Sequence, residues 1–134
     1  MKKLMLIFLS LLLFTACTVD SPLTTTNNWL KDWKNDQNQE AASLLVNNEN
    51  NQISQLSNQQ KTTFIKNFED TYGQIQDFSV QNAIPLSSDG LKPYNVSEGY
   101  EVYYTQVSQK QGEQHLKLIL VKIDGAWKII TPTL

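Results

Sequence analysis

The stretch HLKLILVKIDGAWKIITPTL, residues 115–134, decides the fold of this chain. An apolar run from Leu116 to Ile123 is followed at once by Asp124-Gly125 and then by a second run from Ala126 to Ile130. Asp-Gly between two strand-forming runs is a strong signal for a β-hairpin, because the turn requires positive φ angles and glycine adopts them without steric cost. The sequence therefore predicts a terminal hairpin against which the other elements pack.

Two registers of this hairpin are open, and a slip of one residue exchanges its two faces. A two-residue turn pairs Lys122 with Trp127. A three-residue loop with a glycine bulge pairs Val121 with Trp127 instead, and it places Ile119 and Ile129 on the same face. We favour the bulged loop, because it gathers these four apolar side chains on one face of the sheet.

The N-terminal residues 1–16 are typical of a cleaved signal peptide. Met1-Lys2-Lys3 is a positive segment, and the apolar run from Leu4 to Phe14 has the length of a signal-peptide core. That run is too short for a permanent transmembrane helix, which needs about twenty residues. Cys17, the single cysteine of the chain, comes directly afterwards, so we expect no disulfide within one chain.

The tetrapeptide Phe14-Thr15-Ala16-Cys17 resembles the lipobox of bacterial lipoproteins, although Phe14 stands where leucine is usual. The resemblance implies cleavage before Cys17 and acylation of Cys17 by fatty acids such as palmitate. Acyl chains there would anchor the protein to the membrane stably, because one residue would carry more than one of them. Thr18 follows where an aspartate would imply inner-membrane retention, so the expected location is the cell outer membrane, facing the periplasm, in a cell with two membranes. Residues 17–26 are predicted to be the lipidated cysteine and a tether.

The charge and length of the remaining chain limit what it binds. Of eleven Lys and Arg residues two are Lys2 and Lys3, which leaves nine lysines against thirteen acidic residues and no arginine. Arginine is the preferred residue for bidentate phosphate and base contacts, so we expect no nucleic-acid partner. Residues 27–134 have the length of one domain that can build one hydrophobic core.

Helical periodicity dominates the first half of that domain. The spacing of Trp29 and Trp33 predicts a helix from about residue 27, and a second helix is expected over 36–46. The asparagine-rich segment 47–51 is interpreted as an exposed loop. A third helix is predicted over 57–73, because Ser57 and Gln60 have capping-box spacing, Gly73 ends the pattern, and one face is aromatic, with Phe64, Phe68 and Tyr72.

The second half shows the alternation of β-strands. We expect a strand over 74–84, with Phe78, Val80 and Ile84 on one side and Pro85 at its end. A second strand is expected over 99–108, rich in tyrosine and valine and followed by the terminal hairpin. The pattern predicts an α+β domain in which N-terminal helices pack on a curved antiparallel sheet of about four strands.

The order of these elements resembles the nuclear-transport-factor-2-like, or cystatin-like, cone fold. The segment Val121-Lys122-Ile123-Asp124-Gly125-Ala126-Trp127-Lys128-Ile129 is similar to the ending of small bacterial lipoproteins of that superfamily. In its enzymatic members, isomerases and dehydratases, the open end of the cone holds a base and tyrosines. The corresponding ingredients of this chain are Asp77, His115, Tyr94, Tyr100, Tyr103 and Tyr104. No spacing brings them together, so no catalytic residue is assigned.

Known cofactor and metal motifs are missing from the sequence. One cysteine and one histidine fall short of a metal site, and there is no phosphate-binding glycine loop, so we expect no cofactor. Five aromatic residues are candidates for a pocket or a partner surface: Trp29, Trp33, Tyr100, Tyr104 and Trp127.

The first functional hypothesis is a lipid-anchored envelope protein that binds an envelope protein or a small apolar ligand without catalysis. The second is a small isomerase- or dehydratase-like enzyme that uses the cone pocket, and the third is a structural subunit of an envelope complex. A pocket with a desolvated base would favour the enzyme, whereas a cone filled by its own side chains would favour the binding protein.

Overall fold

The computed structural model describes residues 21–134, so the expected signal peptide and Cys17 lie outside the described residues. Five helical segments occur in that range: α1 (Pro22–Lys34), α2 (Asn38–Ser43), α3 (Asn58–Tyr72), α4 (Ser88–Leu91) and the short 3₁₀ helix η2 (Lys92–Tyr94). The strands are β1 (Leu45–Glu49), β2 (Gln52–Gln55), β3 (Ile75–Pro85), β4 (Gly99–Ser108), β5 (Gly112–Ile123) and β6 (Ala126–Ile130).

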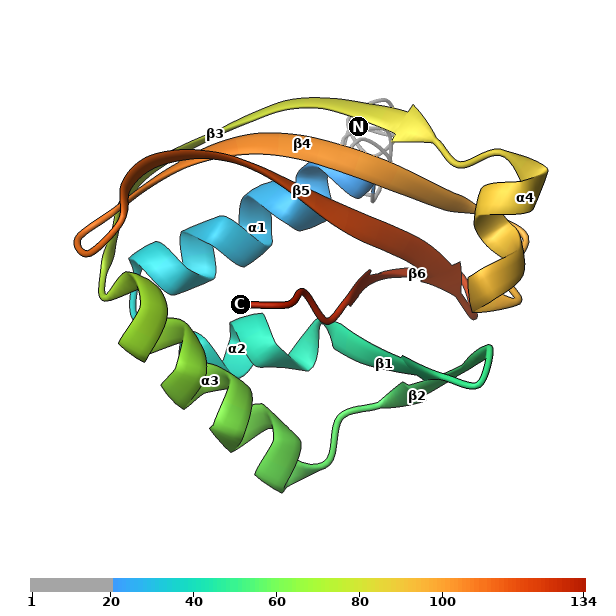
Figure 1. The fold of residues 1–134 in the computed structure, drawn as a ribbon, viewed down its shortest axis with the longest axis horizontal. Coiled ribbons are helices and arrows are strands. Elements are labelled where there is room, and N and C mark those ends of the chain that lie inside the picture. Colours follow the sequence, from blue (N-terminus) through green and yellow to red (C-terminus); the bar gives the residue numbers. More distant parts are fainter. Residues whose placement is uncertain (1–20) are drawn as a thin grey trace, which may run out of the picture.

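All six strands of the described chain form one curved sheet in the order β2-β1-β6-β5-β4-β3. The helices α1, α2 and α3 lie on its inner side, and α1 runs beneath β3, β4 and β5 (Figure 1). The α+β class and the curved sheet with packed helices are therefore confirmed. The expected number of about four antiparallel strands is wrong, because β1 and β2 extend the sheet and β1 pairs with β6 in parallel.

The strands β1 and β2 form a hairpin where the sequence suggested a helix end and a loop. The predicted helix over 36–46 ends at Ser43, and Leu45 and Val46 are instead buried in β1. The chain reverses at Asn50 and Asn51, whose φ angles are 52° and 59°. Asparagine tolerates this left-handed conformation better than most residues, so two adjacent asparagines can make the tight turn.

Helix α1 begins at Pro22, five residues before the expected start. Ser21 caps it by accepting a hydrogen bond from the Thr24 backbone N–H at 3.1 Å. Proline suits the first helical position, because a backbone N–H there would have no acceptor within the helix. Thr25 and Thr26 are buried, so the segment expected to end the tether contributes to the packed domain.

Helix α3 confirms the sequence prediction in detail. Ser57 and Gln60 form the capping box reciprocally, with the Ser57 backbone N–H donating to Gln60 Oε1 at 2.8 Å. Phe64 and Phe68 are buried, and the helix ends at Gly73. Its aromatic side chains pack against Trp33 of α1. The helix thereby lies across the open side of the curved sheet (Figure 1).

The terminal hairpin exists as predicted, but the favoured bulged register is wrong. Lys122 pairs with Trp127 across a two-residue turn, in which Asp124 and Gly125 have φ angles of 50° and 78°. Two successive positive φ angles give the turn whose twist matches that of the strands, and glycine carries its angle without strain. Leu120 pairs with Ile129, and neither is exposed.

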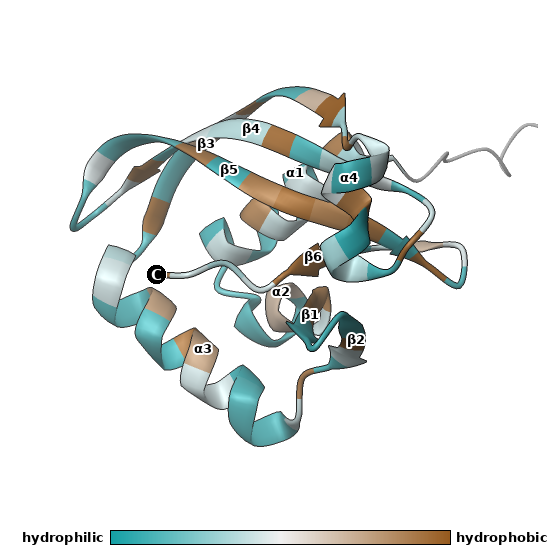
Figure 2. Ribbon diagram, turned by 45° about the vertical axis from the view of Figure 1, so that its right-hand side comes forward, coloured by the Kyte–Doolittle hydropathy of each residue, from teal (hydrophilic) through white to brown (hydrophobic). Residues whose placement is uncertain are grey.

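The pattern of apolar residues does not distinguish the two registers, because both faces of the hairpin are buried and therefore apolar. Val121, on the face away from Leu120, is also fully buried and pairs with Gly99. A Cβ atom on Gly99 would lie 2.8 Å from Leu86 Cδ1, so the segment after β3 packs closely over this outer end of the sheet. Figure 2 shows the resulting long hydrophobic run in β5.

Strand β3 changes faces part-way along its length. Its pairing with β4 shifts between Val80 and Asn82, which leaves Gln81 as an extra residue. Ala83 consequently packs against the core, and Ile84 points outward with 46% of its surface exposed. The prediction that Ile84 shares a face with Phe78 and Val80 is therefore wrong, because strict alternation fails at the shift.

Candidate functional site

The interior of the cone is filled by aromatic side chains. The ring of Phe68 stacks on Trp33 with centroids 3.9 Å apart, and it meets the edge of Trp29 at 6.0 Å. Trp29 also makes an edge contact with Tyr104 at 6.5 Å. These four side chains are at most 4% exposed, so the region where a cone pocket was expected is hydrophobic core.

A small hollow remains beside this cluster, under the last residues of the chain. Its volume is about 60 Å³, whereas sites for small organic ligands typically occupy about 300–1,000 Å³. The residues around it come from α1, α3, β4, β5 and the segment after β6: Trp29, Phe68, Tyr72, Tyr104, Leu116, Lys117, Pro132, Thr133 and Leu134. It can hold a solvent molecule or two, not a substrate of ordinary size.

The structure does not bring the suggested acid–base residues into this interior. Asp77 and His115 are both exposed, and the Asp77 carboxylate accepts a hydrogen bond from the Phe78 backbone N–H at 2.9 Å. Tyr104 does lie inside, where burial raises the pKa of its phenol far above the usual value. A neutral phenol with no base beside it can donate a hydrogen bond but cannot abstract a proton.

The five aromatic candidates divide between two places. Trp29, Trp33, Tyr104 and Trp127 belong to the hydrophobic core, and Tyr100 packs against it. Tyr100 and Trp127 lie together at the far end of the sheet, with centroids 5.5 Å apart and the Lys122 ammonium 5.6 Å from the Trp127 ring centroid. Trp127 is 8% exposed, so this pair offers little surface to a partner.

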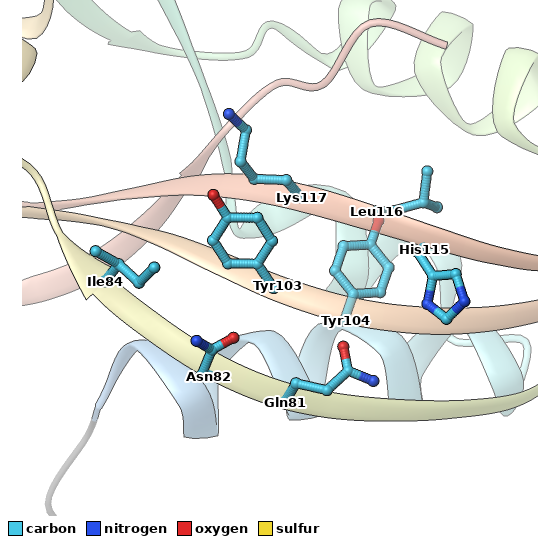
Figure 3. A pocket seen from close by; sticks show the side chains of 8 residues that line it. All are labelled: Gln81, Asn82, Ile84, Tyr103, Tyr104, His115, Leu116 and Lys117. Atoms are coloured by element: carbon cyan, nitrogen blue, oxygen red, sulfur yellow. The ribbon is translucent and has the colours of Figure 1, made fainter.

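A larger hollow lies over the outer side of β3, β4 and β5. Its volume is about 760 Å³, and it is open to solvent. Figure 3 shows the side chains that line it. The residues that line it are Gln81, Asn82, Ile84, Tyr103, Tyr104, His115, Leu116 and Lys117. The side chains of Tyr104 and Leu116 pack on the core side of the sheet. The other six residues supply the side chains of this outer surface, and we call the surface the outer hollow.

One hydrogen-bonded network fixes the middle of the outer hollow. The Tyr103 hydroxyl donates to Glu101 Oε2 at 2.7 Å, and the Lys117 ammonium donates to Glu101 Oε1 at 3.2 Å. These two hydrogen bonds lower the pKa of the Glu101 carboxyl below its usual value, and the bond from Tyr103 has the larger effect. The same bond raises the pKa of the Tyr103 phenol.

A second network lies one step along the strands. Gln81 Nε2 donates to Thr105 Oγ1 at 2.7 Å, and Thr105 Oγ1 lies 3.0 Å from His115 Nδ1. Gln81 reaches Thr105 from the register shift of β3, while His115 faces Thr105 directly across β4 and β5. Sequence reasoning named His115 but missed Gln81, Asn82 and Ile84, because the shift that exposes Ile84 has no clear signal in the sequence.

Two further observations concern metal-binding clusters and membrane spans in the described chain. Within residues 21–134, no three His, Cys, Asp or Glu side chains gather in a way that could hold a metal ion. In the same range, no helix is both long enough and apolar enough to cross a membrane.

Comparisons with known proteins identify the fold alone. No protein family matches the sequence, and a search of curated proteins finds no match. Among solved structures, a Campylobacter jejuni protein described as a proposed NTF2-like transpeptidase superposes with a TM-score of 0.51 at 12% identity. The match covers 84% of this chain and 100% of that protein. The fold is NTF2-like. The expected cone architecture is thereby supported, while at this identity the similarity carries no activity from one protein to the other.

The NTF2-like fold of this chain places its two candidate sites on opposite sides of one sheet. The cone interior, which the resemblance suggested, is occupied by tryptophan and phenylalanine side chains. The outer hollow is open and carries pre-arranged polar groups. The geometry therefore points to the outer side of β3, β4 and β5 as the surface that can receive a ligand.

Proposed function

We propose that this protein is a lipid-anchored envelope protein that binds a ligand or partner, without catalysis, through the outer hollow. The anchor would be the acylated Cys17, and the location would be the outer membrane facing the periplasm in a cell with two membranes. The observation that carries the binding role is the contrast between a filled cone interior and an open hollow of about 760 Å³ on the other side of the sheet.

The volume and the lining of the outer hollow support binding. Its volume lies within the range of about 300–1,000 Å³ that is typical of ligand sites. It combines one half-buried aromatic ring, one exposed aliphatic side chain and several amide and charged groups. Polar groups already held in hydrogen bonds lose little freedom when a ligand arrives, which favours affinity.

The same geometry supports binding over isomerase or dehydratase chemistry. Such a reaction needs a base whose pKa is adjusted by a desolvated cavity. Asp77 and His115 are exposed on the outer side, and the interior beside Tyr104 leaves about 60 Å³. The enzyme hypothesis would require the aromatic cluster of the cone to open first.

The anchor is tested by metabolic labelling of cells that express the full chain. An alkyne analogue of palmitate should label the parent protein, and Cys17→Ser should abolish the label and release the protein from the membrane fraction. Equal labelling of both forms would exclude acylation at Cys17.

The binding surface is tested by photo-crosslinking in cells. A benzophenone amino acid replaces Ile84, which is exposed in the outer hollow, or Lys34, which is exposed on α1 as a matched control. We expect adducts of defined mass from position 84 and none from position 34. Adducts from neither position, or equally from both, would contradict the proposal.

A further inference from the structure

The ring of Tyr103 is held as a fixed platform in the outer hollow. Its hydroxyl is tied to Glu101 at 2.7 Å, and Glu101 is tied in turn to Lys117 at 3.2 Å. Figure 3 shows the ring lying over the strands between Asn82 and Lys117, with Ile84 beside it. Because both ends of the side chain are fixed, a flat ligand can stack on the ring without reordering it.

The charges around this platform cancel locally. Glu101 and Lys117 form an ion pair with each other, and the amides of Gln81 and Asn82 along β3 are neutral. An amide supplies both donors and an acceptor, so it suits a ligand with many hydroxyl or amide groups. Because these charges cancel, the platform offers no net charge to attract an anionic or a cationic partner, which favours a neutral ligand.

An added peptide strand fits this edge of the sheet less well. Strand β3 is one of the two edge strands of the sheet, and strand addition requires a regular row of free backbone groups. Its pairing shifts between Ile75 and Asp77 and again between Val80 and Asn82, and it ends at Pro85. Such irregularities and an edge proline are the features by which proteins prevent strand addition.

We propose that the outer hollow binds a neutral glycan chain that contains N-acetylated sugars. The apolar face of one sugar ring stacks on Tyr103, and its hydroxyl and acetamido groups pair with Gln81, Asn82 and the outer edge of Glu101. The inference rests on the proposed binding function and names its ligand class. An acyl anchor at Cys17 would hold the hollow near the glycans of the cell envelope.

The proposal is tested with the acylated full chain in a detergent that has no sugar headgroup. The probe is a soluble hexamer of N-acetylglucosamine, followed by calorimetry and by protein chemical shifts. We expect saturable binding, and we expect Tyr103→Ala to weaken it by about tenfold because the stacking surface is lost. Tyr103→Phe keeps the ring and should weaken binding by about threefold or less.

Matched controls separate the ring of Tyr103 from general effects. Tyr94, half-buried in η2 outside the hollow, serves as the control tyrosine, and Tyr94→Ala should leave the affinity unchanged. A charged hexapeptide of alternating lysine and glutamate serves as the control ligand and should not bind. Shift changes should map to β3, β4 and β5.

The outcomes distinguish this inference from the proposed function. If the sugar hexamer does not bind, or binds equally to the parent and Tyr103→Ala, the glycan proposal is overturned. Capture of a protein at position 84 in the crosslinking experiment would then leave the proposed binding function standing with a different ligand. Failure of both experiments would overturn both proposals.

Discussion

Replacing Phe68 with alanine should lower the free energy of unfolding by about 4–5 kcal/mol. Removal of a buried phenylalanine side chain costs about 3–5 kcal/mol, depending on how far the surroundings collapse. Phe68 is 2% exposed and contacts four aromatic rings, with centroids at 3.9 Å (Trp33), 4.9 Å (Tyr72), 6.0 Å (Trp29) and 6.1 Å (Phe64). Rigid rings from two helices cannot close the gap, and each aromatic pair adds stability beyond burial alone, so the upper part of that range applies.

Urea unfolding followed by tryptophan fluorescence measures this change. The midpoint should fall while the slope of free energy against urea stays the same, which indicates a loss of stability without a change in the unfolding reaction. Leu23→Ala is the matched control, because Leu23 is 41% exposed on α1 and its truncation should cost about 0.5 kcal/mol or less.

Small apolar ligands provide a second reading of the same variant. Removal of the phenylalanine ring should leave an apolar cavity that can bind benzene. Benzene should therefore raise the unfolding temperature of Phe68→Ala and leave that of the parent unchanged. A cost below about 1 kcal/mol for Phe68→Ala would refute the reasoning. It would show that the cone interior is packed loosely enough to admit a substrate, as the enzyme hypothesis requires.

Four smaller predictions concern single sites. Gly125→Ala should cost about 1–2 kcal/mol, because its φ of 78° strains a side chain. Ser57→Ala should cost about 1 kcal/mol by removing the cap of α3. Gln106→Leu should stabilise by about 1 kcal/mol, because the buried amide finds no partner within residues 21–134. Tyr103→Phe should raise the pKa of Glu101 by removing its main hydrogen bond, as measured by carboxyl NMR titration.

The lowered pKa of Glu101 determines the pH range in which this carboxyl stabilises the fold. A carboxyl whose pKa is lowered by folding adds stability above its unfolded pKa, and that stability is lost as pH falls through the folded value. The difference in unfolding free energy between the parent and Tyr103→Phe should therefore be largest at neutral pH and shrink in acid. A difference that grows in acid would show that the hydrogen bond does not favour the ionised carboxyl.

Matched substitutions serve as controls for two of the other three predictions, and the third has a contradicting outcome. Gly90→Ala should be tolerated, because the new Cβ would meet its nearest neighbour at 3.4 Å and the backbone is not left-handed there. Ser54→Ala removes an exposed serine from β2 and should change stability by about 0.5 kcal/mol or less. A loss of stability in Gln106→Leu would mean that the amide is hydrogen-bonded in solution.

The sequence was most informative where one local signal sufficed. Ser57 and Gln60 cap a helix by contacts three residues apart, and Asp124-Gly125 makes a turn from its own backbone preferences. The start of α1 was also readable, because Ser21 followed by Pro22 is a start signal that the tether interpretation overlooked. Local chemistry determines these features, so no knowledge of distant contacts was needed.

Features that depend on distant strands were not readable in the same way. The hairpin register was misjudged because Val121 is buried beside Gly99, its partner in β4, over which Leu86 packs, so both faces of the hairpin are apolar. Leu45 and Val46 continue a helical pattern, and their pairing with β6 overrides it. The outer hollow was missed for the same reason, since the pairing of β3, β4 and β5 alone assembles its side chains.

The most direct test of the central claim compares two crosslinking positions on the full chain in its native envelope. A photo-crosslinking residue replaces either Ile84 in the outer hollow or Thr133, which is exposed at the small hollow of the cone interior. The account predicts that ligand adducts form at position 84 and not at position 133. Adducts at position 133 with none at position 84 would place the binding site inside the cone and contradict the account.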